Sequence, residues 1–100
     1  MSITSSLSSD GKVVTINVGG RFDFALHQQF LLAYKEHPRG EKEFVVDLEH
    51  ADYMDSSALG MLLQLRDYGM KSGEIRLVNG NQGIREILRI ANFDKLFAVA

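Results

Sequence analysis

The sequence predicts an α/β fold, a single domain over residues 1–100 in which about three to four helices pack on a mixed sheet of four to five strands. Three observations carry this prediction. Residues 12–18 alternate between apolar and polar side chains, which is typical of a strand with one covered face. Residues 44–48 are a nearly continuous apolar run, as in a central strand with both faces buried. Residues 84–91 carry apolar side chains at offsets of three, four and seven, the period of an amphipathic helix.

The chain begins with two predicted strands. Residues 2–7 are expected to pair with residues 12–18 through the turn-forming residues 8–11. The glycine pair Gly19-Gly20 is expected to end the second strand.

The first helix is expected to follow Asp23, whose carboxylate can cap it. The apolar side of this helix carries Leu26, Phe30, Ala33 and Tyr34. Pro38-Arg39-Gly40 should end the helix, because proline cannot continue one. The apolar run at 44–48 then takes a place in the middle of the sheet.

The second half of the chain alternates helices and short strands. Residues 49–55 are mostly polar and are expected to form a loop, and residues 56–70 form a long helix closed by Ser72-Gly73. A short strand is expected at residues 75–77 and a turn at residues 79–81. A helix is expected at residues 84–91, and an apolar tail with a last strand at residues 93–99.

Composition excludes several classes of protein. Eleven Lys and Arg stand against thirteen Asp and Glu, and both signs are scattered, so the basic face of a nucleic-acid binder is absent. There is no cysteine, which favours a reducing compartment, and the cytoplasm is the expected location. No apolar stretch approaches the roughly 18 residues of a membrane span, so no membrane insertion is expected. His27, His37 and His50 share no metal-binding spacing, and no cofactor or metal is expected.

The segment with the clearest chemistry is Asp55-Ser56-Ser57, where a helix begins. Asp55 or Ser56 can act as the N-cap, and a good cap is one complete interpretation. The same position suits a phosphate on Ser56, at the positive end of the helix dipole and among free backbone N–H groups. Such a phosphate adds a charge of about −1.5 to −2 beside Asp55, which would repel a partner surface built for the bare hydroxyl.

Residues 44–60 resemble the phosphorylation motif of STAS domains, the family of bacterial anti-sigma factor antagonists. The shared pattern is a buried strand, a short acidic loop and Asp-Ser-Ser followed by small and apolar residues. The resemblance implies that Ser56 is the phosphoacceptor and Asp55 the acid beside it. Ser57 is the less favoured acceptor and a neighbouring part of the partner-binding site.

Two further features provide candidate partner contacts. Gly20-Arg21-Phe22-Asp23 resembles the family's Gly-x-hydrophobic-Asp, which implies that Asp23 contacts the partner kinase, although its role as a helix cap explains it equally well. Helix 56–70 has more apolar side chains than one buried stripe requires, so Met61 and Tyr68 are expected to form an exposed docking patch. Burial of both residues is the alternative.

The resemblance implies a phosphorylation-controlled regulatory module and no enzyme. It would bind a protein serine kinase, an anti-sigma factor with a histidine-kinase-like ATP site, and Ser56 phosphorylation would release it. A serine phosphatase would reset it, and the module would act as a monomer. Ser56 as a catalytic nucleophile has little support, because no Gly-x-Ser-x-Gly elbow is present. The alternative function is an accessory STAS subunit of a lipid or anion transport complex.

Overall fold

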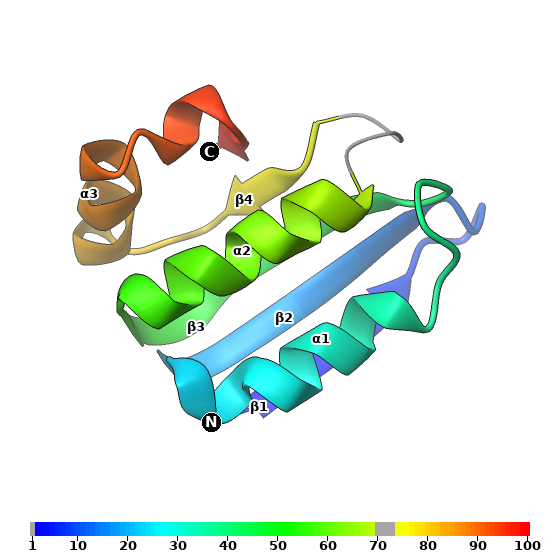
Figure 1. Cartoon of the computed structure of the whole chain (residues 1–100), viewed down its shortest axis with the longest axis horizontal. Coiled ribbons are helices and arrows are strands. Elements are labelled where there is room, and N and C mark those ends of the chain that lie inside the picture. Colours follow the sequence, from blue (N-terminus) through cyan, green and yellow to red (C-terminus); the bar gives the residue numbers. More distant parts are fainter. Residues whose placement is uncertain (1, 70–73) are drawn as a thin grey trace.

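The computed structural model describes residues 2–69 and 74–100, and within them five strands form one mixed sheet in the order β1-β2-β3-β4-β5 (Figure 1). The strands are β1 (Ser2–Leu7), β2 (Val13–Phe22), β3 (Glu43–Met54), β4 (Arg76–Val78) and β5 (Ala98–Val99). β1 is antiparallel to β2, and the other neighbouring pairs are parallel. The predicted mixed sheet is confirmed, with the first two strands paired as expected and the apolar run at 44–48 in the central strand.

Helices follow the parallel strands. In Figure 1, α1 and α2 cross one face of the sheet side by side, and α3 lies on the other side of α2 from α1. The helical segments are η1 (Phe24–Leu26), α1 (His27–Lys35), α2 (Ser56–Gly69), α3 (Gln82–Ile90) and η3 (Phe93–Lys95), of which η1 and η3 are 3-10 helices. The three predicted helices are confirmed, and the predicted end of the second one at Ser72-Gly73 lies outside the described residues.

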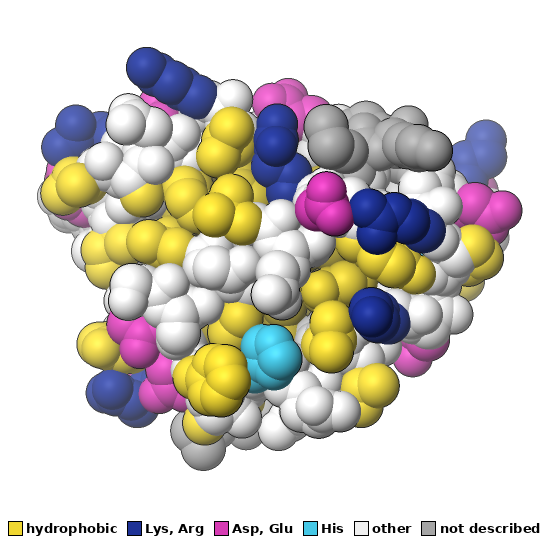
Figure 2. All heavy atoms as spheres, in the orientation of Figure 1, with side chains coloured by type: hydrophobic (Ala, Val, Ile, Leu, Met, Phe, Trp, Pro, Cys, Tyr) yellow, Lys and Arg dark blue, Asp and Glu magenta, His cyan; other side chains and the backbone are white. Residues whose placement is uncertain are grey.

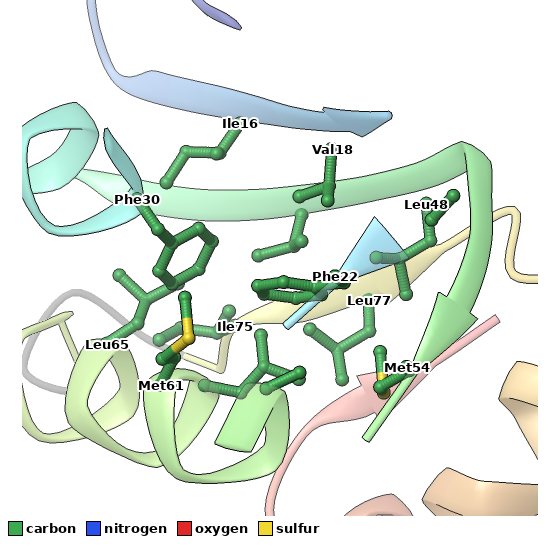
Figure 3. Packing of buried hydrophobic residues seen from close by; sticks show 14 of the residues in the cluster. Ile16, Val18, Phe22, Phe30, Leu48, Met54, Met61, Leu65, Ile75 and Leu77 are labelled. Atoms are coloured by element: carbon green, nitrogen blue, oxygen red, sulfur yellow. The ribbon is translucent and has the colours of Figure 1, made fainter. Parts of the chain in front are cut away.

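The core lies between this helical layer and the facing side of the sheet (Figure 3). Its strand residues include Val14, Ile16, Val18, Phe44, Val46, Leu48 and Leu77, and its helix residues include Phe30, Ala58, Met61, Leu62 and Leu65. On the other side of β3, Val45 is buried but Asp47 is only half-buried. The expectation that both faces of this strand are buried therefore holds for Val45 and not for Asp47.

Two predicted boundaries are wrong, and both concern the same pair of strands. β2 does not end at Gly19-Gly20 but continues to Phe22, and β3 continues to Met54 where a loop was expected. Register shifts between Asn17 and Gly19, and again between Gly20 and Arg21, let the parallel pairing resume after each irregularity. Gly20 has a φ of +78°, which a residue with a side chain rarely adopts, and this explains glycine within the strand.

Two glycines of α2 should respond to substitution in opposite directions. A Cβ on Gly60 would meet no atom within 4 Å, whereas a Cβ on Gly69 would lie 2.7 Å from a ring carbon of the buried Phe44. Gly60→Ala should therefore raise the free energy of unfolding by about 1 kcal/mol, because alanine is the better helix former. Gly69→Ala should lower it by about 1–3 kcal/mol through overpacking. Urea unfolding followed by circular dichroism measures both, and a change of the same sign in the two variants would contradict this packing.

Candidate functional site

The site begins where β2 and β3 end together. Phe22 of β2 pairs with Met54 of β3, and this is the last pair of their parallel ladder. The next residue in each chain segment is an aspartate, Asp23 after β2 and Asp55 after β3. Because parallel strands end at the same edge of a sheet, both carboxylates emerge at one edge, where η1 and the first turn of α2 also start (Figure 1).

Asp55 is the N-cap of α2. One oxygen, Oδ1, accepts the backbone N–H of Ser57 at 3.1 Å, the N–H of Ala58 at 3.2 Å and the hydroxyl of Ser57 at 2.6 Å. The Ser57 hydroxyl is the main cause that lowers the pKa of Asp55. The two backbone N–H groups and the charge of Arg21 act in the same direction, and partial burial opposes them. Asp55 is therefore held as a carboxylate at neutral pH.

The two serines of the motif are in different situations. Ser57 is half-buried, and its hydroxyl donates a hydrogen bond to Asp55. Ser56, the first residue of α2, is exposed, and no hydrogen bond of its hydroxyl is found within residues 2–69 and 74–100. The expectation that free backbone N–H groups surround Ser56 is wrong for Ser57 and Ala58, since Asp55 already accepts both of their amides.

Asp23 uses its two carboxylate oxygens for different partners. Oδ1 accepts the backbone N–H of Ala25 at 3.0 Å, which caps the short helix η1. Oδ2 lies 3.5 Å from Nε of Arg21. Asp23 was expected to cap the first long helix. It caps the short helix η1 instead, and η1 leads directly into α1 at His27.

Arg21 and Tyr53 belong to this edge, and sequence reasoning did not select either of them. The two residues are paired across β2 and β3, and the Arg21 guanidinium lies 3.9 Å from the centre of the Tyr53 ring. This is the distance of a cation–π contact. Phe24 adds a second aromatic group, 67% exposed and stacked on His27 at 4.9 Å between ring centres. The pairing of Arg21 with Tyr53 depends on the register shifts of β2, which no pattern in the sequence indicates.

The exposed patch of Met61 and Tyr68 that was expected on α2 is not found as predicted. Met61 is only 3% exposed and belongs to the core, so the prediction that it lies on the surface is wrong. Tyr68 is half-buried, and its hydroxyl donates a hydrogen bond to the backbone carbonyl of His37. The apolar side chain that α2 does expose is Leu63, at 42%. It lines a groove of about 600 Å³ between α1 and α2, and Figure 2 shows hydrophobic side chains gathered over this face.

Across residues 2–69 and 74–100, no three His, Cys, Asp or Glu side chains are grouped as a metal site would need. No helix in this part of the chain has both the length and the hydropathy to span a bilayer.

Comparison with known proteins identifies the family. A family model described as Mlab, STAS domain matches residues 5–98. The chain belongs to the STAS domain family. A STAS-domain containing protein of Pseudomonas aeruginosa (strain UCBPP-PA14) is 48% identical over 101 residues, and the match covers 100% of both proteins.

Solved structures of other proteins share the fold. An anti-sigma factor antagonist from Mycobacterium paratuberculosis is similar with a TM-score of 0.75 at 22% identity, over 98% of this chain and 85% of that one. The Bacillus cell fate determinant SpoIIAA in its phosphorylated form has a TM-score of 0.67 at 18% identity, over 99% of this chain and 91% of that one. The STAS resemblance predicted from residues 44–60 is confirmed at the level of family and fold.

The lowered pKa of Asp55 predicts how the STAS domain responds to acid. A carboxylate whose folded pKa lies below its unfolded value of about 3.9 contributes stability above that value and loses it as the pH falls through the folded pKa. Wild type should exceed Asp55→Asn in unfolding free energy by about 0.3–1 kcal/mol at pH 7, and the difference should shrink below about pH 4. Urea unfolding from pH 7 to pH 3 measures it. Asp52→Asn, at an exposed position of β3, is the control, and a pH-independent difference for Asp55→Asn would contradict the assignment.

Proposed function

We propose that this STAS domain is a phosphorylation-controlled binding module of the anti-sigma factor antagonist type. With a free Ser56 hydroxyl, it binds a protein serine kinase that acts as an anti-sigma factor and has a histidine-kinase-like ATP site. Phosphorylation of Ser56 releases the partner, and a serine phosphatase restores the hydroxyl. The domain works as a cytoplasmic monomer that binds and is modified, and it catalyses no reaction of its own.

The observation that carries this proposal is the contrast between Ser56 and Ser57. A kinase needs a hydroxyl that can enter its active site, and the exposed Ser56 hydroxyl meets that need. The Ser57 hydroxyl donates a hydrogen bond of 2.6 Å to Asp55, and loss of this hydrogen bond would weaken the cap of α2. Phosphorylation at Ser56 leaves that cap in place, so the domain can be modified and remain folded.

The charges at this edge explain how a phosphate would act on a partner. Asp23 and Asp55 emerge together from the ends of β2 and β3, and a phosphate on Ser56 would add about −1.5 to −2 to them. A partner surface fitted to the bare hydroxyl would then face like-charge repulsion and a desolvation cost. Asp23, Asp55, Ser56 and Ser57 are the proposed partner contacts, and the buried Met61 is not among them.

Relatives support the same kind of function. SpoIIAA is an anti-sigma factor antagonist whose structures in an unphosphorylated and a phosphorylated form both share this fold. Since fold alone does not fix function, the proposal is based on the position of Ser56 together with this family relationship.

The first test is the site of phosphorylation. The full chain, isolated from its own cells, is separated on phosphate-affinity gels and mapped by mass spectrometry, alongside Ser56→Ala and Ser57→Ala. We expect one phosphate on Ser56, lost in Ser56→Ala and retained in Ser57→Ala. A phosphate that remains in Ser56→Ala, or no phosphate under any growth condition, would overturn the proposal.

The second test separates charge from shape at Ser56. Ser56→Ala serves as bait to capture the kinase, and the affinity of this kinase is then measured for Ser56→Asp and for Ser56→Asn, which has nearly the same size without the charge. We expect Ser56→Asp to bind at least about tenfold more weakly than Ser56→Asn, since like charges in an interface cost several kcal/mol. Both variants should keep the thermal midpoint within about 3 °C of wild type, because the position is exposed.

The transport role is the competing outcome of the same experiment. An accessory subunit would be captured with an ATP-binding-cassette protein, and Ser56→Asp would leave that association unchanged. Equal affinities of Ser56→Asp and Ser56→Asn for the captured protein would therefore contradict the switch.

A further inference from the structure

A phosphate on Ser56 would lie next to one carboxylate, Asp55, and at the same edge of the sheet as a second, Asp23. The backbone N–H groups of Ser57 and Ala58, which usually serve an anion at a helix start, are already bonded to Asp55. Asp55 is itself held as a carboxylate, and Asp23 lies at the same edge of the sheet. A cation held nearby in the domain would offset these negative charges.

Arg21 is placed to supply that cation. Its guanidinium lies 3.9 Å from the centre of the Tyr53 ring. Ser56 follows Tyr53 by three residues, so the Cα atoms of Tyr53 and Ser56 are at most about 11 Å apart. The Arg21 side chain is 56% exposed, which leaves it free to change its direction. Its positive charge already reaches Asp55, the residue next to Ser56, where it contributes to lowering the pKa.

The present acidic partner of Arg21 holds it weakly. Nε lies 3.5 Å from Oδ2 of Asp23, longer than the roughly 2.7–2.9 Å of a strong charge-assisted hydrogen bond. A phosphoserine dianion offers about twice the charge of a carboxylate and three acceptor oxygens that match the guanidinium fork. The guanidinium should therefore prefer the phosphate once it is present.

We propose that Arg21 is the internal counter-ion of phosphorylated Ser56, and that its guanidinium moves from Asp23 to the phosphate while Tyr53 supports it at the edge of the sheet. This inference rests on the proposed function, because it concerns the modified state of the same serine. It adds a second change to the switch. When Arg21 turns to the phosphate, the carboxylate of Asp23 loses its cation and faces the partner uncompensated.

The test measures the second ionisation of the phosphate. The full chain is made with phosphoserine incorporated at position 56 during translation, and its second pKa is followed by ³¹P NMR titration. A neighbouring guanidinium favours the dianion and lowers this pKa from its ordinary value of about 6. Arg21→Gln should raise the phosphoserine pKa by about 0.5 unit or more, and Arg21→Lys should restore part of the difference.

Arg39 provides a matched control. It also pairs with an aspartate, Asp67 at 2.9 Å, and also lies over a tyrosine, 5.6 Å from the ring centre of Tyr68, but at the far end of α2. Arg39→Gln should leave the phosphoserine pKa unchanged, and unfolding in urea should remove the effect of Arg21→Gln. Equal titration of the Arg21→Gln and wild-type phosphoproteins, or equal shifts from the two arginines, would overturn the inference. Because the phosphate is installed during translation, this result is independent of whether a cellular kinase modifies Ser56.

Discussion

The parallel pairing of β2 with β3 is the constraint on which the site depends. The two strands reach the same edge only because the register shifts around Gly19 and Gly20 let pairing continue to Phe22 and Met54. Without that continuation the chain would leave the sheet earlier after β2, and Asp23 would not emerge beside Asp55. A local irregularity in one strand therefore determines which charges surround the first turn of α2.

Within this edge, the Asp55 carboxylate keeps the start of α2 independent of Ser56, the proposed phosphorylation site. Oδ1 of Asp55 accepts three donors from Ser57 and Ala58, which satisfies the start of α2 without using Ser56. A serine that capped the helix itself would lose its role on phosphorylation, and the modification would disturb the fold. Because the cap is the residue before it, Ser56 can change its charge while the helix keeps its first turn.

The sequence predicted the elements with regular periodicity and missed those that depend on contacts between strands. The alternation at residues 12–18 and the apolar run at residues 44–48 located two strands. Burial of one or both faces of a strand produces a pattern of apolar residues that is visible within that segment alone. The glycine pair after β2 is typical of a turn, and only pairing with a neighbouring strand makes it a bulge. Met61 was misplaced because α2 is apolar on several sides, and its neighbours, not its own pattern, decide which side is buried.

The same distinction applies to the site. Asp55 and Ser56 were predicted because capping and phosphorylation motifs are local in the chain, whereas Arg21 and Tyr53 become neighbours only through the register of two strands. Charges near a modified side chain act over several ångströms and in any direction, so a linear motif points to the proposed acceptor but not to the proposed counter-ion. A phosphate on Ser56 would add its charge to that of Asp55 beside it, without using the bonds that cap α2. In the proposed modified state, the Arg21 guanidinium would turn from Asp23 to the phosphate and offset this added charge, so that the main effect of the phosphate would fall on the surface that a partner contacts.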